Sequence, residues 1–567
     1  MVKVVIVGGV AGGMSAATRM RRLDESAEIV VFERGAHVSF ANCGLPYYAG
    51  GVIEDRDELL LQTPESLAAR FRLDVRVRSE VAAIDPDART VTVHDLASGD
   101  TYVENYDELV LSTGASPIVP PLPGVERALI LRDVEDVDRL VEQIESAQSS
   151  GAPSAVIVGA GFIGVELAEN LRHRDLDVTV VELADQVLAP LDPEMAAPVA
   201  DRMRENGVRL ELGTQLTSIG ANTAELADGR TLPADVVVMA IGVRPENALA
   251  KMAGADLGER GGVVVDDRMR TSVPHIFAVG DAVEKRDAVG GGVAMIPLAN
   301  PANRQGRLVA DVIAGRPVRA KSSSGTAVVG VFGLIVTATG WNEKRLRAEG
   351  RAHRVVHTHP QSHAGYYPGA QQMAIKLLVD PETDAILGAQ AVGGEGVDKR
   401  IDVIATAMAG GLTASDLADL ELAYAPQFGS AKDPVNMLGY IADNLRTGST
   451  RTVQWHELDT LVAGGASLVD VRTADEFAAG AVPGAVNVPL DELRDRVGEL
   501  PAGDLIVHCQ VGQRGHTAVR LLAGLGRPAA NLDGGYKTWD AGQRANAPSA
   551  SPDIAEPPEG TPCAKLT

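Results

Sequence analysis

The segment SAVIVGAGFIGVELAENLRHRDLDVTVVEL, residues 154–183, decides the fold. An apolar strand pattern leads into Gly159, Gly161 and Gly164, which complete a GxGxxG turn, and a helical pattern and a second strand follow. Glycines in such a turn let the backbone approach a pyrophosphate, and the N–H groups of the helix N-terminus favour the anion. Glu182, at the end of the second strand, is placed to accept a hydrogen bond from a ribose hydroxyl. The segment therefore predicts a dinucleotide-binding unit.

The N-terminus contains a second copy of this pattern, KVVIVGGVAGGMSAATRMRR followed by AEIVVFER. Gly8, Gly12 and Gly13 are present, although Val10 takes the middle position of the motif, and Glu33 ends the second strand. Two such units with matching acidic residues are much more specific than one. They predict two Rossmann-like α/β domains in one chain.

Two shorter motifs fit the same architecture. LVLSTGASP, with Thr113 and Gly114, lies between the two units, and HIFAVGDAV, with Gly280 and Asp281, follows them. A strand that ends at Asp281 would place its carboxylate where the ribityl chain of a flavin could use it. The alternative is that Asp281 only caps a helix.

Composition limits the function classes. The chain has 567 residues, enough for several domains, and a net charge of -24 without a basic block, which argues against nucleic acid and anionic membranes as partners. An apolar run of about 18 residues, as a membrane span requires, is absent from the sequence. Three thinly spread cysteines, Cys43, Cys509 and Cys563, suit a reducing cytoplasm, which is the expected location.

The four nucleotide motifs resemble the two-dinucleotide-binding flavoprotein disulfide reductases, over residues 1 to about 320. The resemblance implies FAD in the first unit, a nicotinamide nucleotide in the second and a homodimeric enzyme. Glu182 is not followed by Arg, which favours NADH, with NADPH left open. The expected domains are the FAD-binding domain at 1–148 and 246–322, the NAD(P)H-binding domain at 149–245, and an α+β interface or dimerisation domain at 323–446.

The C-terminal part resembles a rhodanese, an α/β domain expected at 452–545 and followed by a disordered tail at 546–567. In HCQVGQRG, the loop from Cys509 to Arg514 contains six residues before the expected helix, and its N–H groups would form an anion nest. This geometry suits a persulfide on Cys509, supported by the charge of Arg514, with Asp470 and Arg472 as scaffold. The alternative is a module used only for docking.

Cys43 lies in SFANCGLPYY, residues 39–48, without a second cysteine nearby. Pro46 suits the first turn of a helix, and a helix N-terminus beside a flavin would lower the pKa of the thiol. The alternative is that Cys43 has no chemical role and packs as a small buried hydrophobic residue. The setting is similar to that of the single-cysteine coenzyme A disulfide reductases, which implies a Cys43–S–S–CoA mixed disulfide as the store of two electrons.

This resemblance also implies substrate-binding residues. Tyr367 and Tyr424 match a pair of interface tyrosines that reach the thiol of the partner subunit, with Tyr366 as a second choice of register. The positions that match coenzyme A contacts are Arg19, Arg22, Ser39, Asn42, Asn303, His363 and Lys432. The fused rhodanese favours coenzyme A persulfide over the disulfide, with polysulfide left open, and a resident metal is not expected.

Two alternatives remain at this stage. An NADH oxidase or peroxidase would cycle Cys43 through a sulfenic acid. A sulfurtransferase with a redox-sensing flavoprotein portion would transfer sulfur without NADH-dependent turnover.

Overall fold

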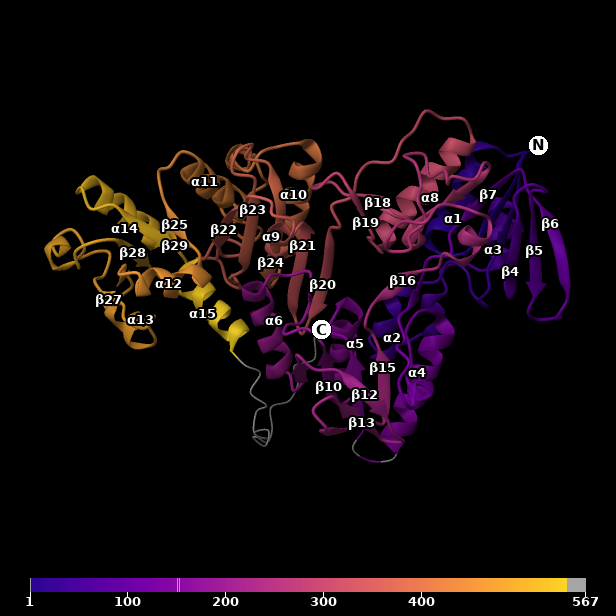
Figure 1. The fold of residues 1–567 in the computed structure, drawn as a ribbon, viewed down its shortest axis with the longest axis horizontal. Helices are drawn as coiled ribbons and strands as arrows, with labels where there is room; N and C mark the ends of the chain where they lie inside the picture. Colours follow the sequence, from indigo (N-terminus) through magenta and orange to yellow (C-terminus); the bar gives the residue numbers. More distant parts are fainter. Residues whose placement is uncertain (1, 150, 152, 548–567) are drawn as a thin grey trace.

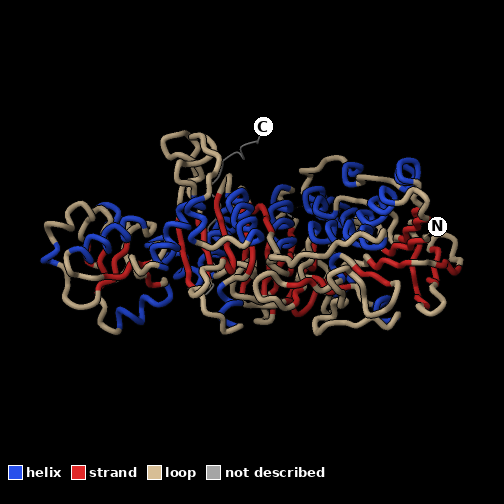
Figure 2. Tube along the Cα trace, turned by 90° about the horizontal axis from the view of Figure 1, so that it is seen from above, coloured by secondary structure: helices blue, strands red, loops and turns tan. Residues whose placement is uncertain are grey.

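The computed structural model describes residues 2–149, 151 and 153–547. The molecule is elongated, with the N-terminal nucleotide domain at one end and the C-terminal domain at the other (Figure 1). Seen from above, the sheets follow one another along the length of the molecule, with helices packed beside them (Figure 2). The predicted mixed α/β fold class is confirmed.

The first sheet is parallel, with the order β17-β7-β1-β2-β3. Its β1 (Lys3–Val7) and β2 (Glu28–Phe32) are joined by α1 (Ala11–Leu23), as the first glycine motif predicts. The remaining strands are β3 (Asp74–Arg76), β7 (Glu108–Leu111) and β17 (Ile276–Ala278). Because β17 comes from far along the sequence, this unit is built from two separate segments of the chain.

Helix α8 (Ala299–Ile313) packs closely on α1. A Cβ atom added at Gly306 would lie 2.1 Å from the carbonyl oxygen of Gly12, so only glycine permits this approach. The contact fixes the second segment of the nucleotide domain on the first.

The second nucleotide unit has a parallel sheet with the order β11-β10-β9-β15. Here β9 (Ser154–Val158), α5 (Phe162–His173) and β10 (Asp177–Glu182) correspond to the quoted segment. The sheet is completed by β11 (Arg209–Leu212) and β15 (Val236–Met239), and α4 (Val134–Ser149) and α6 (Pro193–Glu205) belong to the same unit.

The next unit is an antiparallel sheet with the order β20-β21-β24-β23-β22. The strands are β20 (Ala327–Val331), β21 (Leu334–Gly340), β22 (Arg354–Thr358), β23 (Ala374–Val379) and β24 (Ile386–Gly393). Its helices are α9 (Glu343–Ala348), α10 (Val397–Gly410) and α11 (Pro434–Arg446). Apolar residues of the strands and of α10 and α11 form one buried core, which gives the α+β architecture expected here.

The C-terminal sheet is parallel, with the order β25-β29-β28-β26-β27. The strands are β25 (Thr452–Val453), β26 (Ser467–Asp470), β27 (Val486–Asn487), β28 (Leu505–His508) and β29 (Ala529–Leu532). The helices are α12 (Leu458–Ala463), α13 (Ala474–Ala478), α14 (Gln513–Gly524) and α15 (Gly535–Asn546). Helix α15 continues one residue into the segment predicted as a tail, and residues 548–567 with Cys563 lie outside the described residues.

Smaller elements complete the fold. They are the sheet β4 (Ser79–Asp85), β5 (Thr90–Asp95) and β6 (Thr101–Asn105); the sheet β12 (Leu216–Ile219), β13 (Thr223–Leu226) and β14 (Thr231–Pro233); the pairs β8 (Ala115–Pro117) with β16 (Val243–Pro245) and β18 (Lys285–Arg286) with β19 (Val293–Ala294); and the helices α2 (Leu45–Ala49), α3 (Pro64–Phe71) and α7 (Ala248–Met252). Among the described helices, each is too short or too polar to cross a bilayer.

Candidate active sites

A single cavity of about 2080 Å³ connects the two glycine turns. Its lining includes most of the predicted nucleotide-binding residues and the thiol: Gly8, Gly12, Glu33, Asn42, Cys43, Thr113, Gly114, Gly159, Gly161, Glu182, Gly280 and Asp281. Gly13 and Gly164 are not part of the lining, because they lie inside α1 and α5 where the helices meet their own turns. The cavity is large enough for two extended nucleotides end to end.

The two nucleotide units repeat the same hydrogen bonds. Glu33 accepts from the N–H of Gly9 at 2.7 Å and from that of Gly35 at 2.8 Å. Glu182 accepts from the N–H of Ala160 at 2.7 Å and from that of Ala184 at 2.9 Å. Each carboxylate is thereby held beside its glycine turn, where a ribose hydroxyl would reach it.

The glycine turns require glycine at their first position. Gly8 and Gly159 have φ angles of +103° and +107°. A Cβ atom on Gly8 would clash with the carbonyl oxygen of Ser112, and one on Gly159 with that of Ala240. A Cβ atom at Gly161, in contrast, meets nothing within 4 Å, so this position faces open cavity. The second turn therefore leaves its backbone accessible to a pyrophosphate.

Asp281 provides a test of whether these residues fit a flavin. It lies in the turn after β17, and its Oδ1 atom is buried without a hydrogen-bond partner in the described chain. Burial raises the pKa of its carboxyl, opposed by the nearby Lys285. An orphaned buried acceptor at the cavity wall fits a ribityl hydroxyl of FAD.

Lys285 is a neighbour that the sequence motifs did not reveal. It is buried, donates to the carbonyl oxygens of Gly280 at 2.7 Å and Val283 at 3.2 Å, and burial lowers its pKa to about 8. The only sequence signal was a lysine four residues after the GD pair.

Cys43 lies in the one-turn 3-10 helix 42–44, directly before α2, and lines the cavity. Pro46 occupies the first turn of α2, as predicted. A lower pKa of the thiol is expected from the helix N-terminus together with a bound flavin, whereas the groups of the protein act in the opposite direction. Burial raises the pKa of Cys43, and the charges of Glu166 and Asp281 raise it further.

Glu166, on α5, has the larger effect of these two charges and was not predicted. Tyr47 donates to its Oε1 at 3.1 Å, and burial also raises the pKa of this carboxyl. A protonated Glu166 would remove one of the charges that oppose a thiolate at Cys43. Its only sequence signal was its place on the helix that follows the second glycine turn.

The predicted interface tyrosines lie on neighbouring loops of the α+β domain. The hydroxyl of Tyr424 lies 3.1 Å from that of Tyr366, whereas Tyr367 packs edge-on against His363 at a centroid distance of 5.7 Å. All three tyrosines are exposed in this chain, and Phe428 beside them is 66% exposed. Such a cluster of exposed aromatic side chains is typical of a protein interface.

Arg400 joins these two loops and was missed by the sequence motifs. Its buried guanidinium pairs with Asp433 at 2.8 Å and donates to the carbonyl oxygen of Ser362 at 2.9 Å. Ser362 begins the loop of Tyr366 and Tyr367, and Asp433 follows the loop of Tyr424 and Lys432.

Most of the predicted coenzyme A residues do not line the cavity that Cys43 lines. Apart from Asn42, they lie outside the cavity lining: Arg19, Arg22, Ser39, Asn303, His363 and Lys432. Arg19 is not a free cation, because Asp311 on α8 holds it at 2.7 Å. Arg22 is exposed and lies over the ring of Phe71, and Asn303 accepts from Ser15.

Cys509 directly follows β28 and is fully buried. The loop after it is shorter than predicted, because α14 begins at Gln513 and Arg514 therefore lies in its first turn. Arg514 makes a bidentate ion pair with Glu476, at 2.6 and 2.7 Å, and the thiol lies close enough to raise the pKa of the guanidinium slightly further. Glu476 was missed, although the TADE sequence at 473–476 has the form of a capping box.

Asp470 and Arg472 support this loop as a buried ion pair. They lie 2.7 Å apart, and Arg472 also donates to the side chain of Gln510 at 3.0 Å and stacks on Tyr536. This contact agrees with the predicted scaffold role, since Gln510 is the residue after Cys509.

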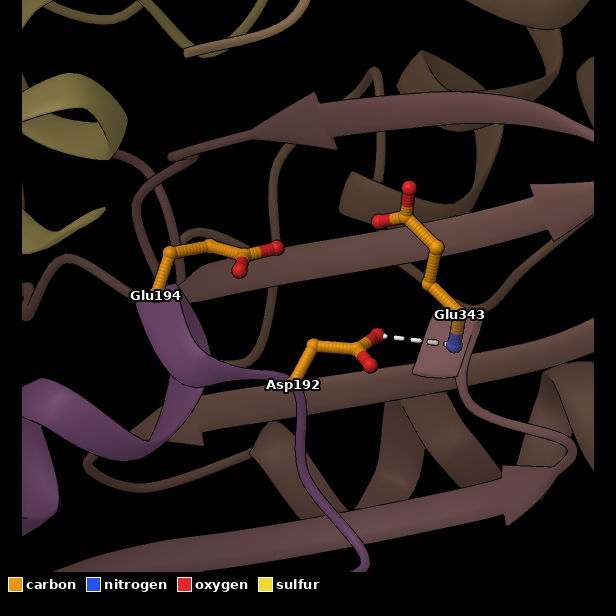
Figure 3. A group of neighbouring side chains, drawn as sticks. All are labelled: Asp192, Glu194 and Glu343. Atoms are coloured by element: carbon orange, nitrogen blue, oxygen red, sulfur yellow. Dashed lines mark hydrogen bonds between the residues drawn. The ribbon is translucent and has the colours of Figure 1, made fainter. Parts of the chain in front are cut away.

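Three carboxylates elsewhere lie close enough to hold a metal ion, Asp192, Glu194 and Glu343 (Figure 3). The amino group of Lys376 lies 2.9, 2.6 and 2.5 Å from them, respectively. The cluster is therefore a cage around a buried ammonium group.

Two nucleotide turns on one cavity with a thiol on its wall are typical of a nucleotide-dependent disulfide oxidoreductase, here followed by a further α/β domain. The chain belongs to the pyridine nucleotide-disulphide oxidoreductase family, whose model matches residues 2–306, with the family's dimerisation domain at 326–434. A rhodanese-like domain matches residues 454–542.

Known proteins share this organisation. The coenzyme A disulfide reductase of Staphylococcus aureus is 34% identical over 443 residues, which is 78% of this chain and 100% of that protein. The crystal structure of reduced Bacillus anthracis CoADR-RHD is 48% identical with a TM-score of 0.94, over 95% of this chain and 98% of that chain. An NAD-dependent persulfide reductase from A. fulgidus is 36% identical with a TM-score of 0.88, over 95% and 100%. The predicted resemblance to rhodanese-fused coenzyme A disulfide reductases is confirmed.

Proposed function

We propose that the protein is an NADH-dependent reductase of coenzyme A persulfide, also able to reduce coenzyme A disulfide, in which Cys509 handles sulfane sulfur. The observation that carries this proposal is the single thiol, Cys43, on the wall of the shared cavity, without another described cysteine to pair with it. A lone thiol needs a second sulfur from its substrate to store two electrons as a disulfide.

The thiolate of Cys43 attacks the coenzyme A sulfur of the persulfide and releases hydrosulfide, leaving Cys43–S–S–CoA. Two electrons and a proton then return the Cys43 thiolate and free coenzyme A. The overall reaction is NADH + H⁺ + CoA-SSH → NAD⁺ + CoA-SH + H₂S. FAD bound beside Glu33 and Asp281 would supply the two-electron transfer between NADH and the disulfide.

Several residues of this chain support the cycle. Glu33 and Asp281 would hold FAD, and Glu182 the ribose of NADH. Arg22, Ser39, Asn42, Asn303, His363 and Lys432 would contact coenzyme A, with Arg19 acting from its pair with Asp311. The exposed tyrosines would complete the site of a partner subunit in a homodimer.

We expect Tyr367→Phe and Tyr424→Phe each to lower kcat for persulfide reduction by about 10- to 100-fold, the usual range for loss of a general acid. Their hydroxyls would donate to the leaving thiolate of coenzyme A. Tyr366→Phe is the matched control and should cost less than about threefold, because its hydroxyl is not assigned a proton transfer and loses one exposed hydrogen bond, to Tyr424. Steady-state kinetics of the three variants settle the register, and a larger loss in Tyr366→Phe than in Tyr367→Phe would reverse the assignment.

We expect NADH to be preferred over NADPH by at least about tenfold in kcat/KM, because a 2′-phosphate would meet the fixed carboxylate of Glu182. Leu183, directly after it, is 69% exposed. Leu183→Arg should therefore raise kcat/KM for NADPH about tenfold, since a guanidinium there can pair with the phosphate. Leu183→Gln, the uncharged control, should leave the ratio near that of the wild type.

The decisive experiment is anaerobic NADH oxidation with coenzyme A persulfide and with the disulfide, while hydrosulfide is measured. Fast persulfide turnover with stoichiometric hydrosulfide supports the proposal. Equal or faster reduction of the disulfide would make the protein a disulfide reductase first. Rapid oxidation of NADH by oxygen or peroxide alone would favour the sulfenic acid alternative instead.

A further inference from the structure

A buried chain of charges joins the rhodanese domain to the rest of the molecule. His357, in β22, donates from its backbone N–H and from Nδ1 to Oδ2 of Asp533, at 2.9 and 2.8 Å. Its Nε2 lies 3.0 Å from Oε1 of Glu194, on α6. All three residues are buried. One imidazole therefore connects the rhodanese domain, the antiparallel sheet and the second nucleotide unit.

The contacts require a doubly protonated ring. A neutral imidazole has one N–H donor, yet both ring nitrogens of His357 face carboxylates at hydrogen-bond distance. Burial alone would lower the pKa of His357, but the hydrogen bonds to Asp533 and Glu194 raise it to about 9. The imidazolium also balances two carboxylates that would otherwise be buried with less compensation.

The turn after Asp533 rests directly on the Cys509 loop. Gly534 and Gly535 have φ angles of +66° and +64°, and a Cβ atom at Gly535 would lie 2.4 Å from the carbonyl oxygen of Cys509. The N-terminus of α15 donates to the same loop, from Tyr536 N–H to the Cys509 carbonyl at 2.8 Å. The position of the thiol thus depends on the position of this turn.

His357 holds the turn from the other side. A Cβ atom at Gly534 would lie 2.8 Å from Cβ of His357, so the histidine packs against the turn as well as binding Asp533. Asp533 receives a further hydrogen bond from Gln454 at 3.1 Å, within the rhodanese domain itself. Among the described residues, His357 alone binds this carboxylate from outside the rhodanese domain by a hydrogen bond or ion pair.

We propose that His357 is a positioning residue for Cys509: from outside the rhodanese domain, it fixes Asp533 and with it the glycine turn that supports the Cys509 loop. The inference rests on the proposed sulfurtransferase role of Cys509. Sulfur handling by the rhodanese domain then depends on its docking to the reductase, although His357 does not touch the thiol.

The test compares His357→Asn with His359→Asn in the full-length protein. His359 is a suitable control because its Nε2 contacts Thr538 in α15 at 2.8 Å without binding Asp533. The readouts are the rate at which iodoacetamide labels Cys509, followed by mass spectrometry, and thiosulfate:cyanide sulfur transfer. We expect His357→Asn to label about tenfold faster and to transfer sulfur about tenfold more slowly, with NADH-dependent turnover retained. His359→Asn should stay within about threefold of the wild type.

A variant on the other side of the contact separates positioning from general damage. Asp533→Asn should reproduce the effect of His357→Asn, and the double variant should be no worse than either single one, because both act through one contact. Additive losses, or equal labelling of wild type and His357→Asn, would overturn the inference. If the wild type lacks sulfur transfer but its labelling still responds to His357→Asn, the sulfurtransferase proposal fails and the positioning role stands.

The pH dependence gives a second signature. Since the folded pKa is raised, the imidazolium contact is complete below the ordinary pKa of histidine and is lost as pH rises through about 9. The charged groups that face the ring are Glu194 and Asp533, with Lys376 and the neutral His359 nearby. The rate at which iodoacetamide labels Cys509, divided by its rate with free cysteine, should rise above pH 9 in the wild type. In His357→Asn this ratio should not change with pH.

Discussion

Cys43→Ser should abolish NADH-dependent persulfide and disulfide reduction, with a loss of at least about 10³-fold in kcat, because the hydroxyl cannot form the mixed disulfide. The fold should be unaffected, since Cys43 lines an open cavity and is not part of a core cluster. Anaerobic stopped-flow measurement of NADH oxidation, with the two acceptors added separately, gives the result directly.

Cys509→Ser is the matched control for this experiment. It removes the other described thiol, which is 0% exposed and follows β28 in the C-terminal domain. It should leave reduction of preformed coenzyme A persulfide within about threefold. Thiosulfate:cyanide sulfur transfer should respond in the opposite way, lost in Cys509→Ser and kept in Cys43→Ser. A Cys43→Ser enzyme that still reduced persulfide at the wild-type rate would contradict the mechanism.

The nucleotide units could be predicted from sequence because their signals are local. A glycine turn, an apolar strand and an acidic strand end lie within about 30 residues, and backbone conformation alone decides which residue is allowed at Gly8 or Gly159. The rhodanese loop is similar, because Cys509 and Arg514 are close in the sequence.

The electrostatic environment could not be predicted in the same way, because it depends on contacts between distant segments. Burial raises the pKa of Cys43, and Glu166 and Asp281 add charges from other segments of the chain, whereas the sequence shows only the start of helix α2 beside the thiol. Arg19 illustrates the same limit. Its spacing from Arg22 indicates an exposed face, but α8 brings Asp311 onto it from almost 300 residues away.

The carboxylate cage around Lys376 is a second such case, and it carries the largest stability effect we expect. Lys376 is 0% exposed and contacts Asp192, Glu194 and Glu343, which come from two different units of the chain. Lys376→Met removes the cation and leaves three buried carboxylates without it, and removal of one partner of a buried ion pair costs about 3–5 kcal/mol. We therefore expect undocking of α6 from the antiparallel sheet at a clearly lower temperature, measured by thermal unfolding of the holoenzyme.

Charge, and not side-chain volume, should account for this loss. Adding Glu194→Gln and Glu343→Gln to Lys376→Met should recover part of the stability, because neutral amides remove two of the three buried charges that the ammonium group balances. The pH dependence has a definite sign. Lys376 and His357 hold the pKa of Glu194 well below its ordinary value, and His353 and Lys376 do the same for Glu343. The contribution of the cage is therefore present above about pH 4.5 and is lost only as pH falls far below it. In Lys376→Met the same carboxylates lack the ammonium group, and mild acid should stabilise the variant by protonating them. A variant that loses stability equally at pH 5 and pH 8 would show instead that the methylene chain of Lys376, packed in the sheet, is what matters.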